Sequence, residues 1–114
     1  MDLNQKEKRQ FPRIQINSAI RYQIRGKPAT KEAVCENISS SGAGILDNEF
    51  IAPKTILMLE INILSSVLPL IGVVRYVKII PRSGRYYLGV EFIEAEPGDK
   101  RFISEYINMR LNKL

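Results

Sequence analysis

Histidine and tryptophan are absent from this chain of 114 residues, and cysteine occurs once, at Cys35. Without histidine, the sequence lacks the commonest general acid or base and the commonest metal ligand. A single cysteine can form neither a disulfide framework nor a cysteine-based zinc site. A thiol with no histidine to activate it is a poor nucleophile. We therefore predict that the protein is not an enzyme, holds no metal and buries Cys35 as a small apolar side chain.

Long apolar runs are missing as well. The longest, from Val67 to Val74, is far shorter than the roughly 20 residues that a membrane-spanning helix needs. The first ten residues, MDLNQKEKRQ, lack the apolar core of a signal peptide. We therefore expect a cytoplasmic protein without a transmembrane segment.

The composition is that of one small folded domain. Hydrophobic residues make up 45% of the chain and charged residues 25%, an ordinary globular balance. The net charge is +5, so the surface favours anionic partners such as nucleotides, nucleic acid or lipid headgroups. Charge alone does not choose among them.

Apolar and polar residues alternate along most of the chain after position 13, which is the pattern of strands with one buried face. Sixteen isoleucines support this interpretation, because β-branched side chains suit a pleated sheet. Pro69 and Gly72 lie inside one predicted strand and indicate an edge or a bulge there. The predicted strands cover residues 14–24, 30–38, a short stretch near 45–46, 57–63, 67–80 and 86–92.

The period changes near the C-terminus to that of an amphipathic helix over about residues 99–113, with Asp99 as its N-cap. The apolar stripe of this helix consists of Phe102, Ile103, Tyr106, Ile107, Leu111 and Leu114. A single helix must bury such a stripe against the sheet or at one end of a barrel. We predict a mainly β fold, a small antiparallel six-stranded β-barrel over 14–114 that includes this helix.

Two short polar motifs flank the first two predicted strands. Arg9 and Arg13 form R-x-x-x-R just before the first strand, where they could be a solvated tail, a nucleic-acid clamp or half of a small-molecule site. Asn37, Ser39 and Gly42 form N-x-S-x-x-G between the second and third strands. Alone, the second motif is equally typical of a turn built on asparagine or serine.

Taken together, the two motifs resemble those of the PilZ domain family. The segment LGVEF, residues 88–92, is similar to the late G-V-x-F strand of that family, and a C-terminal helix follows it here as there. The segment VVRYV, residues 73–77, resembles the preceding family strand. The resemblance extends from about residue 7 to residue 111, and four motifs in the right order make it specific.

The resemblance implies binding of cyclic di-GMP, a bacterial second messenger with two guanines and two phosphates. It implies that Arg9 and Arg13 wrap the ligand from the N-terminal side, while Asn37, Ser39 and Gly42 meet it from the barrel. Lys8 and Arg75 are possible additional ligand-binding residues. Arginine suits this ligand because its guanidinium grips a phosphate, pairs with guanine O6 and N7, or stacks on a purine.

We further expect residues 1–13 to be a flexible segment that folds over the barrel when ligand binds, so that a partner protein reads the change. The family suggests motility, adhesion or exopolysaccharide machinery as that partner. Two alternatives stay open. One is a PilZ-like adaptor that contacts proteins without nucleotide, although such members usually lack the motif residues that are present here. The other is a basic nucleic-acid-binding barrel with stacking tyrosines at Tyr22, Tyr76, Tyr86 and Tyr87.

Overall fold

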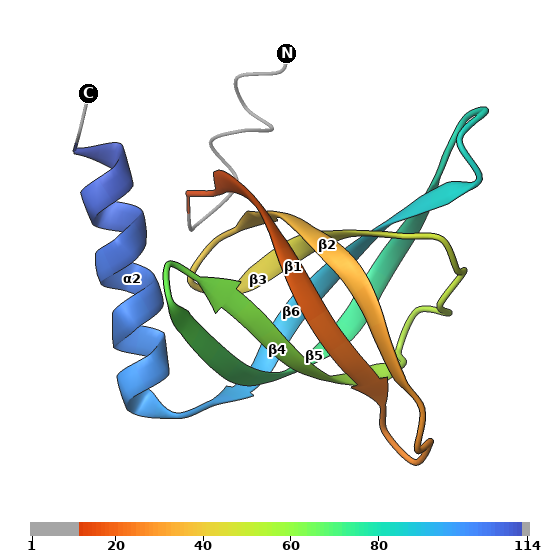
Figure 1. Cartoon of the computed structure of the whole chain (residues 1–114), viewed down its shortest axis with the longest axis horizontal. Helices are drawn as coiled ribbons and strands as arrows, with labels where there is room; N and C mark the ends of the chain where they lie inside the picture. The colour runs from red at the N-terminus through yellow and green to blue at the C-terminus, as the bar shows by residue number, and fades with distance from the viewer. Residues whose placement is uncertain (1–11, 113–114) are drawn as a thin grey trace.

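The computed structural model describes residues 12–112 as six β-strands followed by one helix (Figure 1). The strands are β1 (Ile14–Ile24), β2 (Thr30–Ile38), β3 (Gly42–Asp47), β4 (Ile56–Ile63), β5 (Ser66–Ile80) and β6 (Arg85–Ala95), and the helix is α2 (Pro97–Leu111). The predicted fold class, a six-stranded antiparallel barrel with a C-terminal helix, is confirmed.

The strands close into a barrel in the order β1-β2-β3-β6-β5-β4. Two of the pairings join strands that are far apart in the sequence. β3 pairs with β6 from Gly42↔Glu91 to Asp47↔Tyr86, and β1 pairs with β4. The β3–β6 pairing places the segment after β2 beside residues 86–91, and this brings the parts of the candidate site together.

The irregular positions predicted in β5 are present. Pro69 pairs with Glu60 of β4, but the pairing of β5 with β6 begins only one residue later. A proline suits such a one-sided position because it has no N–H to donate. The register with β6 shifts next to Gly72 and again at Arg75, which is an extra residue in β5. Such bulges change the direction in which the neighbouring side chains point.

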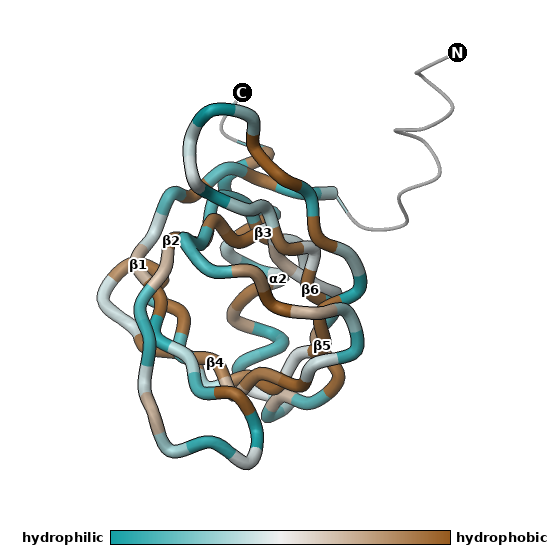
Figure 2. Tube along the Cα trace, turned by 90° about the vertical axis from the view of Figure 1, so that its right-hand side faces the viewer, coloured by the Kyte–Doolittle hydropathy of each residue, from teal (hydrophilic) through white to brown (hydrophobic). Residues whose placement is uncertain are grey.

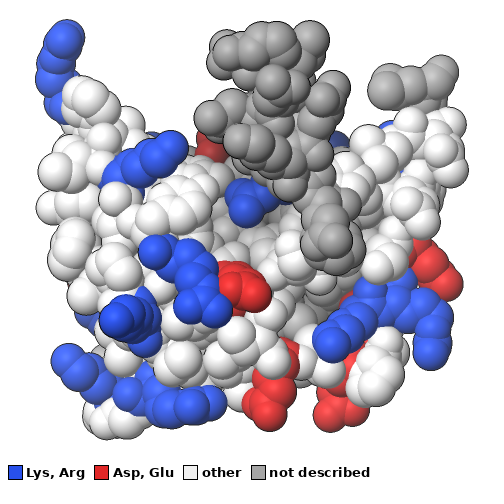
Figure 3. All heavy atoms as spheres, turned by 180° about the vertical axis from the view of Figure 1, so that it is seen from behind, with Lys and Arg blue, Asp and Glu red and all other residues white. Residues whose placement is uncertain are grey.

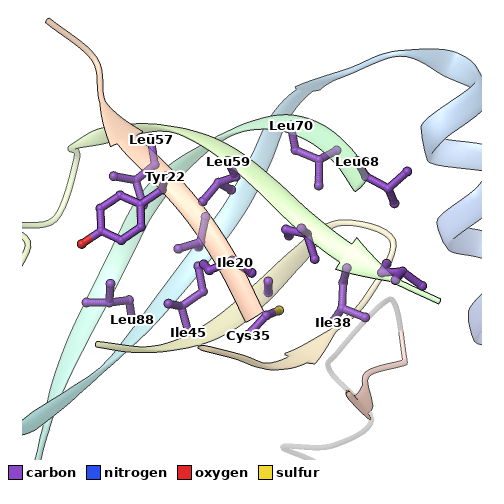
Figure 4. Close-up of a cluster of buried hydrophobic side chains, with 14 of the residues drawn as sticks. Ile20, Tyr22, Cys35, Ile38, Ile45, Leu57, Leu59, Leu68, Leu70 and Leu88 are labelled. Atoms are coloured by element: carbon purple, nitrogen blue, oxygen red, sulfur yellow. The ribbon is translucent and has the colours of Figure 1, made fainter. Parts of the chain in front are cut away.

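Branched aliphatic side chains fill the barrel, as the alternating pattern requires. Hydrophobic residues recur along every strand (Figure 2), and Figure 4 shows part of the buried cluster. Each such side chain contributes roughly 1.5–3 kcal/mol when it is fully buried. Cys35 belongs to this cluster and is 0% exposed, so its predicted burial is confirmed. The largest members are Ile20, Tyr22, Ile38, Ile45, Leu57, Leu59, Ile61 and Leu88.

One polar pair lies within the core. The Tyr22 hydroxyl donates a hydrogen bond to the carboxylate of Asp47, which is itself buried. The other Asp47 oxygen accepts from the backbone N–H of Glu49 at 3.2 Å. Burial, reinforced by the neighbouring carboxylate, raises the pKa of Tyr22 well above its usual value. Both polar groups are therefore satisfied, which removes most of the cost of burying them.

Helix α2 begins two residues earlier than the sequence predicted. Its N-cap is Glu96, which makes no side-chain capping bond, and Asp99 lies in the first turn instead. The assignment of Asp99 as N-cap was wrong, because Pro97, with its fixed φ and missing N–H, already suits the first helical position. In the first turn, Asp99 still interacts favourably with the helix dipole.

The apolar stripe of α2 is narrower than predicted. Ile103 and Ile107 are buried in the core, and Phe102 and Tyr106 pack partly against it. Leu111 is 39% exposed, so its predicted burial was wrong. Leu114 lies outside the described residues.

A polar contact joins the end of α2 to the start of β1. Arg110 donates from Nη2 to the carbonyl oxygen of Gln15 at 2.8 Å and from Nη1 to the Tyr106 hydroxyl at 2.8 Å. The helix therefore contacts β1 two residues after Arg13. In residues 12–112, no helix has both the length and the apolar character needed to cross a membrane.

Candidate functional site

Arg13 lies at the centre of the candidate site, just before β1. Its half-buried guanidinium donates from Nη1 to Asn37 Oδ1 at 2.9 Å and to the Tyr87 hydroxyl at 3.4 Å. The pairing of β1 with β2 places these groups together, because Gln15 lies opposite Asn37. The sequence prediction that Arg13 and Asn37 belong to one site is consistent with this contact.

Asn37 connects three strands through its side-chain amide. Besides Arg13, its Oδ1 accepts from the backbone N–H of Gly44 in β3 at 3.1 Å. Its Nδ2 donates to the Tyr87 hydroxyl of β6 at 3.0 Å. A register shift in the β2–β3 pairing between Cys35 and Asn37 accompanies this arrangement. Asn37 is thereby held in one orientation.

Two glycines make room for two tyrosine rings on the same outer face. Gly44 and Gly89 lie opposite each other in the β3–β6 pairing. A Cβ on Gly44 would collide with the Tyr87 hydroxyl, and one on Gly89 would collide with the Tyr76 ring. The Tyr76 and Tyr87 rings stack on each other with centroids 6.3 Å apart and an interplanar angle of 28°. The Lys78 ammonium lies 5.5 Å from the Tyr76 centroid.

We call the surface formed by Arg13, Asn37, Gly44, Tyr76 and Tyr87 the Arg13 face. Gly44 and Tyr87 are not among the site residues predicted from the sequence, and Tyr76 and Tyr87 were expected only as stacking groups in the nucleic-acid alternative. A signal for them was present. Glycine within a strand pattern often marks a place where a side chain or a ligand approaches the backbone closely.

Ser39 and Gly42 shape the loop that adjoins the Arg13 face. Ser39 is 1% exposed, and its Oγ accepts from the backbone N–H groups of Ser41 and Gly42, each at 3.1 Å. Gly42 packs so closely against the Val90 carbonyl of β6 that no Cβ would fit. Contact between the Ser39 side chain and a ligand is still a prediction, and it requires this turn to rearrange.

Arg75 lies on the same side of the barrel, over β6. Its Nε donates to Glu91 Oε1 at 2.6 Å, and both side chains are about half exposed. Glu91 pairs with Gly42 on its other side, so the ion pair adjoins the Ser39–Gly42 loop. Figure 3 views the molecule from behind, toward the side formed by β5 and β6, where lysine and arginine side chains outnumber acidic ones. The predicted site residues Lys8 and Arg9 lie outside the described residues.

Cys35 lies beneath the Arg13 face and is chemically inert there. Its thiol donates to the Asn37 carbonyl oxygen at 3.3 Å. Burial raises the pKa of Cys35 to about 12, although the nearby charge of Arg13 opposes the shift. The thiol is therefore protonated at neutral pH, and a thiol without thiolate character is a poor nucleophile.

A groove lies on a different part of the barrel. It is a groove of about 590 Å³ over the outer sides of β1, β4, β5 and the end of β6. Met58 and Ile71 contribute apolar surface, and three carboxylates line it against one guanidinium, Arg21. We call it the glutamate groove, after its lining residues Glu60, Glu94 and Glu96. Its charge disfavours an anionic ligand.

Comparison with known proteins identifies relatives of this architecture. The family model of the PilZ domain matches residues 7–109. The Bacillus subtilis inhibitor of motility MotI/DgrA shares the fold with a TM-score of 0.77 and 23% identity, over 92% of this chain and 52% of that chain. The PilZ domain of Escherichia coli YcgR, solved with c-di-GMP, gives a TM-score of 0.71 at 15% identity, over 92% of both chains.

A further structure, the c-di-GMP complex of K. pneumonia MrkH, gives a TM-score of 0.69 at 17% identity, over 92% of this chain and 53% of that chain. The present chain therefore spans about half the length of MotI and of MrkH. No curated protein sequence matches it. At these identities, the likeness to solved structures establishes the fold.

Proposed function

Because this chain belongs to the PilZ domain family, we propose that it is a receptor for cyclic di-GMP that binds the nucleotide on the Arg13 face. The observation that carries the proposal is the contact of Arg13 with Asn37 and Tyr87, which joins the two sequence motifs in one place. The solved structures of YcgR and MrkH with c-di-GMP support the choice of ligand.

The chemistry of the Arg13 face suits a cyclic dinucleotide. The guanidinium offers five N–H donors, and few of them are used by Asn37 and Tyr87. It can therefore grip a phosphate or pair with the O6 and N7 atoms of guanine. The stacked rings of Tyr76 and Tyr87 present an aromatic surface for a purine. A side-chain amide at position 37 binds guanine without the cost of burying a carboxylate.

We extend the proposal to the N-terminal residues 1–13. Arg9 reaches the ligand from the side opposite to Asn37, with Lys8 beside it, and the segment closes over the barrel as the nucleotide binds. Fixing about eight residues costs roughly 1–2 kcal/mol of backbone entropy each, so the arginine contacts must offset a large cost. Binding and ordering are then coupled, and a downstream protein of the motility, adhesion or exopolysaccharide machinery senses the change.

Amide hydrogen exchange tests this coupling. Protection of residues 5–13 should rise sharply with cyclic di-GMP, while β1 (Ile14–Ile24) should change little. Full protection of residues 5–13 in the free protein would show that the site is preformed and would refute the switch.

Calorimetry tests the receptor function itself. We expect cyclic di-GMP to bind with a dissociation constant in the micromolar range or tighter, and GTP to bind at least tenfold more weakly. The titration also gives the number of ligand molecules per chain. Equal affinities for the two nucleotides, or no heat with cyclic di-GMP, would contradict the proposal.

A further inference from the structure

The hairpin of β5 and β6 extends well past the barrel wall. Pairing of β4 with β5 begins at Ile56↔Val73, and pairing of β3 with β6 ends at Asp47↔Tyr86. The β5–β6 pairing continues to Ile80↔Arg85. We call residues 75–86 the hairpin arm, and Figure 1 shows it projecting on the side of the barrel away from α2.

The β5 strand of this arm has an open edge. Its last contacts on the β4 side are made by Val74, whose N–H donates to Thr55 at 2.9 Å and whose carbonyl accepts from Lys54 at 2.7 Å. Beyond Val74, no strand within residues 12–112 pairs with β5 on that side. Residues 75–80 thus present the backbone groups along which a further extended chain can add.

Side chains on the two faces of the arm differ in character. Ile79 is 75% exposed and pairs with Tyr86, and the 58% exposed Phe50 packs edge-on against Tyr86 with ring centroids 5.8 Å apart. On the opposite face, Lys78 and Arg85 are exposed. Residues 76–90 hold three lysines or arginines and no acidic residue. One face of the arm is therefore apolar, and the other carries the basic side chains beside Tyr76 and Ile80.

We propose that residues 75–80 of β5 are the docking edge for an extended acidic segment of a partner protein. The segment adds as a strand beside β5 and alternates acidic residues, which face Lys78, with apolar residues, which cover Ile79. Alternation follows because successive side chains of a strand point to opposite faces. Pairing with a second copy of this chain is disfavoured, because equivalent edges would place lysines and arginines against each other.

The docking edge overlaps the Arg13 face, because Tyr76 belongs to both and stacks on Tyr87, the residue paired with Lys78. A ligand that stacks on these rings therefore contacts the first residues of the edge. The inference therefore deepens the part of the proposed function that concerns a protein partner, and rests on it. Nucleotide binding does not require a partner segment to occupy the docking edge.

Selection of peptides tests the docking edge. We would select 12-residue peptides from a random displayed library against the full chain, then measure their binding to it. The expected peptides alternate acidic and β-branched residues, and they increase the hydrogen-exchange protection of amides in residues 75–80. Lys78→Glu combined with Arg85→Glu should weaken their binding at least tenfold, and Ile79→Thr about fivefold. The matched control is Lys100→Glu with Arg101→Glu, two exposed residues of α2. It should change the affinity for the peptides less than twofold.

Several results would overturn the inference: no enriched peptide, basic or uncharged peptides, protection outside residues 75–80, or equal weakening by both charge-reversal variants. Calorimetry with cyclic di-GMP on the same samples separates this inference from the proposed function. Retained nucleotide binding without an acidic peptide refutes the docking edge alone. Acidic peptides on the edge of a chain that binds no cyclic di-GMP support the edge and refute the receptor function.

Discussion

The Arg13 face and the glutamate groove differ in charge and in the way they are built. The Arg13 face is lined by a guanidinium, an amide and two tyrosines, which are fitted over the glycines at positions 44 and 89. The glutamate groove has a volume of about 590 Å³ and is lined by three carboxylates. The Arg13 face is formed by Arg13 and by residues of β2, β3, β5 and β6, whereas the groove lies mainly over β1, β4 and β5.

The contrast teaches that the volume of a groove does not identify the binding site of an anionic ligand unless the charges that line the groove are also considered. The glutamate groove would repel the two phosphates of a cyclic dinucleotide. On the Arg13 face, the proposed binding mode would bring the same phosphates to Arg13, which bonds Asn37, with Lys78 nearby over Tyr76. Charge and fixed hydrogen-bonding groups, rather than volume, identify the candidate site.

Among the predicted effects, removal of the Arg13 guanidinium should cause the largest loss of affinity for cyclic di-GMP, and removal of a guanidinium from the groove should not. Arg13→Ala removes charge-assisted contacts of about 1.5–3 kcal/mol, so we expect roughly ten- to a hundredfold weaker binding of cyclic di-GMP in calorimetry. The matched change in the glutamate groove, Arg21→Ala, should alter affinity less than twofold. Equal losses of affinity in both variants would show that the Arg13 face and the glutamate groove do not differ as nucleotide sites.

Alkaline pH should lower the stability of the whole barrel through two buried side chains, one near each surface. Cys35 lies beneath the Arg13 face and Tyr22 lines the groove, and burial raises the pKa of each. Above pH 9, the unfolded thiol loses its proton while the folded thiol keeps it. The free energy of unfolding should therefore fall as pH rises, by up to about 1.4 kcal/mol per pH unit for each group. Urea unfolding from pH 7 to 11 measures the decline.

Cys35→Ala separates the two contributions to this alkaline loss. The variant should be less stable at pH 7, because it leaves a small cavity, but its stability should decline less steeply between pH 9 and 11. A decline as steep as that of the wild type would show that Cys35 is not responsible.

A methyl group at position 44 should damage the Arg13 face without unfolding the barrel. In Gly44→Ala, the new Cβ displaces the Tyr87 hydroxyl and breaks its hydrogen bond with Asn37. We expect about fivefold weaker binding of cyclic di-GMP, equivalent to about 1 kcal/mol. Gly98→Ala is the control, because no atom lies within 4 Å of the position that its methyl group would take. It should leave affinity unchanged, and a loss as large as in Gly44→Ala would contradict this account.

Arg75→Ala should give the smallest effect. The Arg75–Glu91 pair is about half exposed on both sides, and such pairs contribute about 0.2–1 kcal/mol to stability. We expect thermal unfolding to shift slightly and nucleotide affinity to fall less than threefold. A loss comparable with that of Arg13→Ala would make Arg75 a principal ligand-binding residue and would extend the site across β6.

Local patterns predicted the strands and the bulge near Gly72, whereas the assignment of Arg13 and Asn37 to one site rested on the family resemblance and stays a prediction. They succeed because alternation and turn chemistry act over a few residues. The roles of Gly44 and Tyr87 depend on which strands become neighbours, and the β3–β6 pairing that decides this joins segments far apart in the sequence. The glutamate groove was not predicted for the same reason, since residues of five strands contribute to it.

Amide chemical shifts measured during a titration with cyclic di-GMP test the central claim most directly. The account predicts that the largest changes fall on Asn37, Gly44 and Gly89 of the Arg13 face. The amides of Met58 and Glu60 in the glutamate groove should move little. The largest changes in the groove, or no changes on the Arg13 face at saturating nucleotide, would contradict the account.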